Sequence, residues 1–330
     1  MKFFRDRDGK PISVLKSFFR QQYASPVIEI IVLTIVFSIF TESFMTSFNI
    51  FGLSRTSSVY AFIGAAQLIV ILIGDINLSI GGCGALCTVL MGTMMQDFGM
   101  PTGIAFLAGL LLSVLCGLIN GGLIIKTKLS PWIITLSTNF IFTGLAFGYS
   151  RGYPYTVPES LTWIGRTTIL QWGSVLLVLM TILCICIYIS FRYLRLGREI
   201  LAVGGNRGAA RLSGINVEQT VVICYVISCI MAYLAAVLWG CRTGTISPST
   251  GADWTLYSIA VCAIAGIPLT GGVVTALGFF CGGWILSMVR NGLAMLHVDT
   301  YYEQVYLGLL ILLAVSIESF RTMFSNRSKQ

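Results

Sequence analysis

Residues 58–95 read SVYAFIGAAQLIVILIGDINLSIGGCGALCTVLMGTMM, so that two apolar segments lie on either side of a short polar break. The segments 58–74 and 78–95 each approach the roughly 20 residues with which a helix spans a bilayer. Asp75 is the only charged residue in this stretch. Because backbone N–H and C=O groups cannot stay unpaired in lipid, such a break must line a cavity or be buried in protein. The stretch therefore predicts a membrane protein with a broken helix near 74–82.

The polar residues of this break have two interpretations. Broken helices aim free backbone groups at transported solutes, which makes Asp75, Asn77 and Ser79 candidates for a substrate path. A tight cytoplasmic turn with a helix N-cap at Asn77 or Ser79 explains the same residues. The sequence does not distinguish between them.

The composition of the whole chain agrees with a membrane location. Of its 330 residues, 56% are hydrophobic and 10% are charged, whereas a soluble domain is about 25% charged. The polar residues are too few to cover a water-exposed surface of this size, so lipid must be the solvent for much of it.

Ten spanning segments can be drawn by the criterion of apolar length. They are 27–45, 58–74, 78–95, 103–125, 132–149, 173–191, 217–240, 254–266, 272–289 and 301–320. With the N-terminus in the cytoplasm, sixteen of the 21 Lys and Arg residues fall inside and five outside, as the positive-inside rule requires. The prediction is an all-α polytopic fold with both termini cytoplasmic. It comprises a tail at 1–26, one permease domain at 27–321 with a cytoplasmic loop at 192–216, and a tail at 322–330.

The sequence contains no motif for ATP binding, zinc binding or a catalytic triad. There is no G-x-x-x-x-G-K-[ST] loop for ATP, and the single histidine, His297, has no partners at zinc-site spacing. No serine has a suggestive histidine and carboxylate. The ten cysteines, among them Cys83, Cys87 and Cys116, lie mostly in apolar runs and are expected to pack as small hydrophobes. We therefore expect neither an enzyme nor a metal site.

A second break and two other patterns lie within the apolar segments. Residues 265–272 read AGIPLTGG, in which Pro268 and Thr270 are further candidates for the substrate path. This break could be a pseudo-repeat of the first, although the topology places both on the cytoplasmic side and so gives no inverted relation.

Thr135 and Asn139 are four residues apart and share one helix face. Such a polar stripe marks either a solute path or hydrogen bonds between helices. The pairs Gly117/Gly121 and Gly278/Gly282 are G-x-x-x-G patterns that allow helices to pack closely.

The cytoplasmic stretch 197–217 reads GREILAVGGNRGAARLSGINV and fits two short helical pieces joined at Gly204-Gly205-Asn206. Its small residues would allow close docking to a partner, and Arg207 and Arg211 would present a basic face. An amphipathic loop that lies on anionic lipid headgroups is the alternative.

Three segments carry a family resemblance. INLSIGG (76–82), AVGGNRGAARLSGINV (202–217) and NGLAMLHVDTYYEQVYLGLLILLAV (291–315) resemble, in this order along the chain, elements of the permeases in the ribose/xylose/arabinose class of ATP-binding-cassette (ABC) importers. The sequence departs from the family pattern at Asn77, where aspartate is usual, and in the element AGIPLTGGVVTA (265–276). A monosaccharide such as a pentose is the expected solute. Because of these departures, nucleosides, polyols and a furanone signal are further candidates.

The resemblance implies the mechanism and the partners. The cytoplasmic loop would be a coupling helix that docks on a cytosolic ATPase with two nucleotide-binding domains, which binds ATP and Mg while this chain holds no cofactor. The coupling residues would be Glu199, Gly204, Gly205, Asn206, Arg207, Ala209, Ala210, Arg211, Leu212, Ser213, Gly214 and Ile215. Further implied partners are a second permease, identical or related, an extracytoplasmic solute-binding protein and membrane lipid, with no nucleic acid. The location would be a bacterial cytoplasmic (inner) membrane.

A secondary transporter driven by an ion gradient is the main alternative. That class needs ionisable residues within the membrane. Here Glu29, Glu42 and Glu318 fall near segment ends, and Asp75 lies at a break. This scarcity favours a permease that depends on a separate ATPase.

Overall fold

The computed structural model describes residues 24–169 and 172–296, together with a few positions between 302 and 309. The described residues form twelve helices. They are α2 (Ala24–Phe40), α3 (Ser47–Ile71), α4 (Ile80–Gln96), α5 (Thr102–Thr127), α6 (Pro131–Ser150), α7 (Glu159–Arg166), α8 (Val175–Tyr193), α9 (Arg195–Gly205), α10 (Arg207–Leu212), α11 (Val217–Thr243), α12 (Trp254–Ile264) and α13 (Ala276–Met295). The helical fold expected from the sequence is confirmed for these residues.

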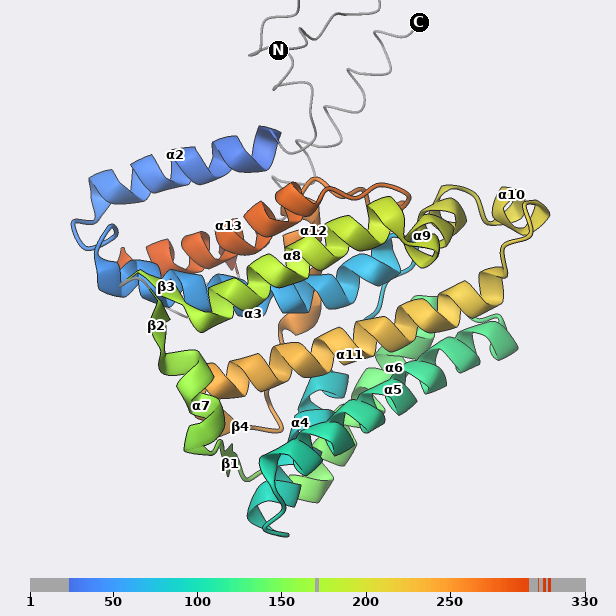
Figure 1. Ribbon diagram of the computed structural model, residues 1–330, viewed down its shortest axis with the longest axis horizontal. Helices are drawn as coiled ribbons and strands as arrows, with labels where there is room; N and C mark the ends of the chain where they lie inside the picture. Colours follow the sequence, from blue (N-terminus) through green and yellow to red (C-terminus); the bar gives the residue numbers. More distant parts are fainter. Residues whose placement is uncertain (1–23, 170–171, 297–301, 303–304, 307, 310–330) are drawn as a thin grey trace, which may run out of the picture.

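Two minimal antiparallel pairings depart from a purely α-helical fold. β1 (Tyr155–Thr156) pairs with β4 (Thr245–Ile246), and β2 (Thr168–Ile169) pairs with β3 (Gly173–Ser174). Each strand has two residues. These strands join the loops at the end of the molecule opposite α9 and α10 (Figure 1). Strands of two residues are too short to give a recognisable alternation of apolar and polar residues in the sequence.

Four of the described helices are long and apolar enough to cross a membrane by themselves, namely α5, α6, α8 and α11. The apolar helices α4 and α12 are shorter, with 17 and 11 residues.

α3 begins at Ser47, well before the expected start at residue 58, so that Arg55 lies in a helix and not in a loop. An Arg55 N–H donates to the backbone oxygen of Arg242 (2.6 Å). The expected span at 301–320 and both tails lie almost entirely outside the described residues.

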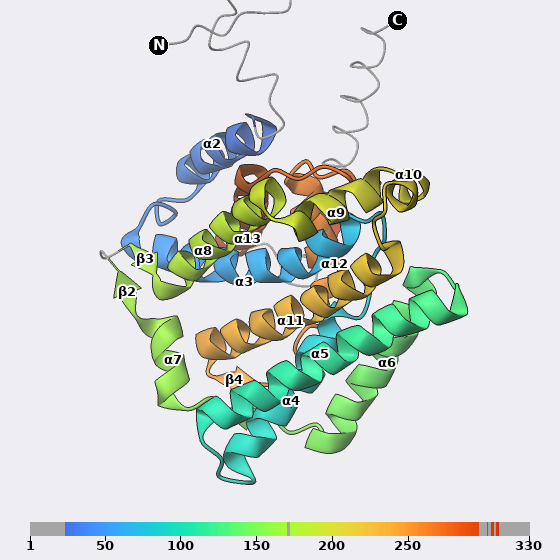
Figure 2. The same ribbon diagram turned by 45° about the vertical axis from the view of Figure 1, so that its right-hand side comes forward.

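α11 lies between α3 and α5 along much of its length (Figures 1 and 2). A Cβ atom at Gly117 would come within 2.4 Å of the Cα of Val226, and one at Gly121 within 2.8 Å of the Cα of Val222. Gly278 and Gly282 likewise lie against the backbone of α12. Both G-x-x-x-G pairs therefore allow close helix contact, as the sequence predicted.

The chain turns back into the fold after α3. Gly74 adopts a left-handed conformation (φ +80°), and residues 75–79 follow without regular secondary structure until α4 begins at Ile80. The side chain of Asn77 donates to Ser228 Oγ (2.8 Å). Ser228 lies about 17 Å from the start of the 27-residue α11, at about 1.5 Å per residue. α4 is thus a half-helix that begins near the middle of the fold.

A second re-entry follows α11. Residues 247–253 bring Gly251 against Gly81, where an added Cβ would lie 2.0 Å from the Gly251 oxygen. α12 begins beside α4, since Trp254 touches Gly84. The two half-helices then diverge: the end of α4 packs against β1, where a Cβ at Gly92 would lie 2.8 Å from the Tyr155 side chain, whereas α12 leads to a loop at 265–275 that contacts the end of α3. They start together and run to opposite sides of the molecule.

The sequence left open whether the breaks at 74–82 and 265–272 are pseudo-repeats. The segment that meets the start of α4 is the re-entry at 247–253, and α4 and α12 run in opposite directions from it. The break at 265–272 lies beyond α12 and packs on the first break: the backbone N–H of Gly272 donates to Leu72 O (3.1 Å).

The close contact between α5 and α11 can be tested within one helix. We expect Gly117→Ala to lower the free energy of unfolding by about 1–3 kcal/mol, since its methyl group would meet the α11 backbone. Gly122→Ala is the control, because nothing lies within 4 Å of a Cβ there, and it should be neutral or slightly stabilising. Thermal unfolding of the purified chain in detergent measures both. Equal midpoints for the two variants would contradict the packing described here.

Candidate functional site

The loop at 192–216, which the sequence predicted to be cytoplasmic, contains the two short helices that were expected. α9 ends at Gly205, and α10 begins at Arg207 with Asn206 as its N-cap, whose Oδ1 accepts from the N–H of Ala209 (2.9 Å). α9 buries Ile200 and Val203 against the fold. On α10, Leu212 is 92% exposed. The loop therefore has an anchored first helix and a projecting second one.

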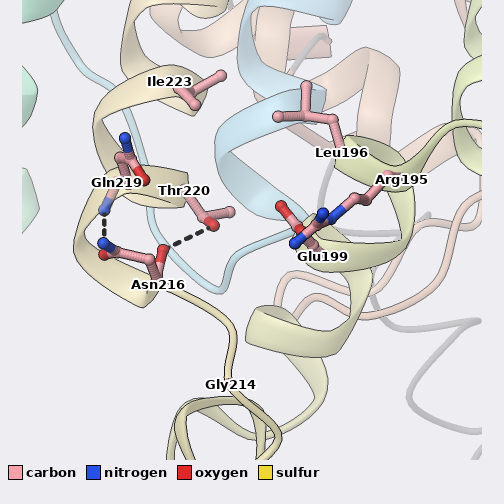
Figure 3. Close-up of a pocket in the computed structure, with 8 residues that line it drawn as sticks. All are labelled: Arg195, Leu196, Glu199, Gly214, Asn216, Gln219, Thr220 and Ile223. Carbon is pink, nitrogen blue, oxygen red and sulfur yellow. Dashed lines mark hydrogen bonds and ion pairs between the residues drawn. The ribbon is translucent and has the colours of Figure 1, made fainter.

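Two hollows flank this loop. The first, of about 440 Å³, lies between α9 and α11 (Figure 3). It is lined by Arg195, Leu196, Glu199, Gly214, Asn216, Gln219, Thr220 and Ile223. Asn216 caps α11 by accepting from the N–H of Gln219 (3.0 Å), while Arg195 pairs with Glu199 (2.7 Å). The hollow thus presents both polar and apolar side chains.

The second hollow, of about 570 Å³, lies between α10 and the α5–α6 connection. Lys128, Arg207 and Arg211 contribute to its lining together with apolar residues of α5 and α11. Arg211 forms an ion pair with Glu218. Basic residues distant in the sequence therefore gather on the side of the molecule that carries α9 and α10.

The end of α9 packs directly on the first break. An added Cβ at Gly204 would lie 1.8 Å from Leu72 O, and one at Gly271 would lie 2.8 Å from the same oxygen. Glycine is required at both positions for this close approach. α9, the end of α3 and the 265–272 loop therefore form one junction.

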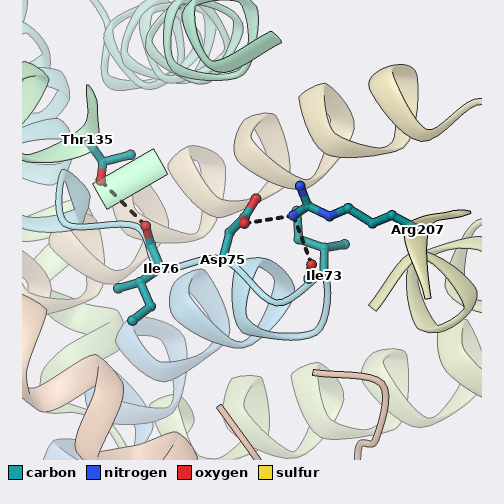
Figure 4. Close-up of polar contacts among 5 residues, drawn as sticks. All are labelled: Ile73, Asp75, Ile76, Thr135 and Arg207. Atoms are coloured by element: carbon teal, nitrogen blue, oxygen red, sulfur yellow. Dashed lines mark hydrogen bonds and ion pairs between the residues drawn. The ribbon is translucent and has the colours of Figure 1, made fainter. Parts of the chain in front are cut away.

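An ion pair joins this junction to α10. Arg207 donates to Asp75 Oδ1 (2.7 Å) and to the backbone oxygen of Ile73 (3.1 Å), as Figure 4 shows. Asp75 is 8% exposed, whereas the Arg207 side chain is 47% exposed. Burial raises the pKa of the Asp75 carboxyl, and the charge and hydrogen bond of Arg207 offset part of this effect. Asp75 is therefore a neighbour of the loop that carries α9 and α10.

Asn77 and Ser79 lie in a buried polar network. Asn77 Oδ1 accepts from the backbone N–H (2.9 Å) and hydroxyl (2.7 Å) of Ser79, and Asn120 Nδ2 donates to Ser79 Oγ (2.8 Å). Ser228 Oγ accepts from Asn77 and donates to Ala66 O (2.6 Å). All four side chains of the network are fully buried. The network needs an amide at 77, because Ser228 has no second proton to give a carboxylate.

Thr135 and Asn139 of α6 satisfy backbone groups of the broken helix. Thr135 Oγ1 accepts from the N–H of Leu78 (3.0 Å), and Asn139 Oδ1 accepts from the N–H of Gly82 (2.9 Å). On the other side, Thr255 of α12 donates to Leu78 O (3.2 Å). The polar stripe thus forms bonds between helices, which was one of its two predicted roles.

Asn139 also faces a cavity of about 110 Å³ at the start of α4. Its other lining residues are Gly81, Gly82, Thr143, Phe147, Pro248, Ser249, Thr250, Gly251 and Ala252. None of these side chains is charged, so the cavity offers amide, hydroxyl and backbone groups beside an aromatic ring. It lies where the two half-helices begin.

The predicted path residues therefore separate into groups. Asn139 lines the cavity, Asn77 and Ser79 lie behind it in the network, and Asp75 lies at the loop junction. Pro268 and Thr270 do not line the cavity. They lie on the loop beyond α12, in which the backbone N–H of Gly271 donates to Pro268 O (3.0 Å).

Three polar residues of this region were not identified as site residues from the sequence, namely Asn120, Ser228 and Thr143. Each is a polar residue in the middle of an apolar segment, which is the signal that could have identified it.

Comparison with known proteins gives consistent matches along the chain. A family model described as "Branched-chain amino acid transport system / permease component" matches residues 49–315. The D-allose transport system permease protein of Escherichia coli K12 is 32% identical over 92% of this chain and 93% of its own length. The fructose import permease protein of Rhizobium meliloti is 30% identical (96% and 91%), and the ribose import permease protein of Bacillus subtilis is 31% identical (90% and 92%). No solved structure matches the chain.

The amide at position 77 can be tested against a carboxylate. We expect Asn77→Asp to lower the free energy of unfolding by about 2 kcal/mol, because it removes the donor to Ser228 and buries a group that prefers to be charged. Asn216→Asp is the matched control, since aspartate serves equally well as an N-cap at this exposed position. Thermal unfolding in detergent at neutral pH measures both. An Asn77→Asp variant as stable as the wild type would contradict the network.

Proposed function

The chain belongs to this family of transport-system permease components, the membrane-spanning subunits of ABC importers, and from this premise we propose that it forms the path of a monosaccharide, such as a pentose, across the bacterial inner membrane. As a permease component it has no ATPase site of its own and depends on a separate chain for ATP hydrolysis. The solute, the topology and the coupling residues are the new parts of the proposal.

The lining of the cavity beside α4 carries the choice of solute. The lining offers neutral hydrogen-bonding groups from Gly81, Gly82, Asn139, Thr143 and Thr250. Phe147 adds an aromatic ring. A neutral polyhydroxylated solute fits such a lining, whereas a zwitterionic amino acid would leave two charges without partners. The relatives named for allose, fructose and ribose import support a sugar. Nucleosides, polyols and a furanone signal are the alternatives within the family.

The proposed topology has ten spanning segments within 27–321 and both tails, 1–26 and 322–330, in the cytoplasm. The positive-inside count supports it. The grouping of Lys128 with Arg207 and Arg211 around one hollow supports it independently, because these residues come from different loops.

The proposed coupling element comprises residues 199–215 on α9 and α10. They would dock on a cytosolic ATPase with two nucleotide-binding domains, which binds ATP and Mg. The exposed Leu212 and the two flanking hollows support docking at this place. The contacts from Gly204 to Leu72 and from Arg207 to Asp75 would pass a movement of the loop to residues 75–79, and from there to α4 and the cavity.

Two further partners complete the proposed importer. A second permease, identical or related, would pair with this chain within the lipid, and an extracytoplasmic solute-binding protein would deliver the solute at the end that carries α7 and the short strands (Figure 1). A transporter driven by an ion gradient is less well supported, because the charge of Asp75 at the break is already paired with Arg207.

Uptake by proteoliposomes tests the proposal. The vesicles contain this permease, its ATPase and its binding protein, and the panel contains pentoses, hexoses, nucleosides, polyols and leucine. We expect ATP-dependent uptake of a sugar. Uptake of leucine or a nucleoside would overturn the solute, whereas uptake by this chain alone under a proton or sodium gradient would contradict the importer itself.

Leu212→Ser tests the coupling element in the same vesicles. Loss of an apolar side chain from the interface should reduce ATP-driven uptake about tenfold, since burial of a leucine contributes about 1.5–3 kcal/mol. Recovery of the ATPase with the purified permease in detergent is measured beside uptake, and Phe98→Ser is the control for this recovery, because Phe98 is also an exposed apolar residue (63%) but lies in the α4–α5 connection, away from α10. Equal recovery of the ATPase by both variants would show that α10 does not dock on it.

A further inference from the structure

Three cysteines from two of the predicted apolar segments, 78–95 and 103–125, meet inside the fold. Cys83 and Cys87 lie on α4 and Cys116 lies on α5, and their sulfur atoms are all within 4.8 Å of one another. We propose that these three thiols form a binding site for one thiophilic divalent metal ion. The expectation that the cysteines only fill space took no account of this convergence.

The geometry is close to that of a three-coordinate sulfur site. Cys83 and Cys87 are four residues apart on one face of α4, with their sulfurs 4.0 Å apart. Three sulfurs around one ion, with metal–sulfur bonds of about 2.3 Å, would be about 4.0 Å from each other. Cys116 supplies the third ligand from the facing helix. Small side-chain rotations therefore suffice to close the site.

The donor set and its surroundings define the class of ion. Sulfur ligands without carboxylates select soft metals and exclude Mg²⁺ and Ca²⁺. All three side chains are buried, at 0%, 0% and 1% exposure. A divalent ion bound by two thiolates and one thiol is neutral, and its binding releases two protons. Neutrality matters here because an uncompensated charge is costly in an apolar interior.

Groups around the cluster hold its members in place. Cys83 Sγ lies 3.8 Å from the backbone oxygen of Cys229, and the Cys229 sulfur lies 4.0 Å from the amide nitrogen of Asn120. α11 thus supplies a second layer of contacts behind the thiols, as metal ligands usually have. In the part of the chain that the structure describes, this is the one group of three such ligand atoms.

A bound ion would fix α4 against α5 beside the cavity. Cys83 directly follows Gly82, which lines that cavity. A ligand that binds only the folded chain raises the unfolding midpoint. The site therefore predicts stabilisation by metal, and this readout does not depend on the transported solute or the ATPase.

Cadmium is the probe. The full-length chain is expressed with Cd²⁺ in the medium, so that the ion is present as α4 and α5 pack, and is purified in detergent without chelator. We expect one Cd²⁺ per chain by elemental analysis, a sulfur-to-metal charge-transfer absorption band and a raised unfolding midpoint. Single substitutions Cys83→Ser, Cys87→Ser and Cys116→Ser should each weaken binding about tenfold or more, as loss of a ligand requires.

Cys262→Ser is the matched control. Cys262 is equally buried, but its sulfur contacts only a backbone oxygen, that of Gly64 (3.5 Å), among the hydrogen bonds described for it. It should retain full Cd²⁺ content, and size-exclusion chromatography verifies that each variant is folded. Absence of Cd²⁺ from the wild type overturns the proposal, and so does a folded Cys116→Ser variant that retains the ion and the absorption band.

Discussion

Backbone groups that leave a helix inside a bilayer need partners, and this requirement organises the centre of the fold. The N–H groups of Leu78 and Gly82 donate to Thr135 and Asn139 of α6, and Leu78 O accepts from Thr255 of α12. The broken segment can therefore lie between α6 and α12 with these backbone groups paired. Side chains of α6 and α12, and not the backbone of a preceding helical turn, pair with the backbone groups of this segment. α4 can therefore begin beside α12, with a polar cavity at the start of both helices.

The same segment connects the two ends of the proposed mechanism. Its first charged residue, Asp75, is held by Arg207 of the coupling loop, and its last residues enter the helix that lines the cavity. Charge and polarity are divided along it: the carboxylate lies at the junction, where Arg207 is partly exposed, and the neutral amide of Asn77 lies in the buried network. This division accounts for the neutral side chain at position 77, where the network requires an amide donor to Ser228.

The sequence predicted those features that depend on neighbours along the chain. Apolar length located the helices, Gly204-Gly205-Asn206 separated α9 from α10, and the spacing of Gly117 and Gly121 predicted a close helix contact. Features that depend on distant partners were missed or misjudged. The re-entry at 247–253 and the roles of Asn120 and Ser228 were not identified, and three cysteines from two helices met unexpectedly. Their positions follow from helix packing, which periodicity alone does not determine.

In the proposed importer, the Asp75–Arg207 contact transmits movement from the α9–α10 loop to the broken helix. A double-mutant cycle on ATP-driven uptake tests this transmission, with Asp75→Asn, Arg207→Gln and the double variant in the reconstituted system. We expect each single change to reduce uptake and the double variant to be no worse than Arg207→Gln alone, because without Arg207 the Asp75 side chain has no ion-pair partner left to lose. Losses that simply add, or full uptake by Asp75→Asn, would show that the contact does not transmit the movement.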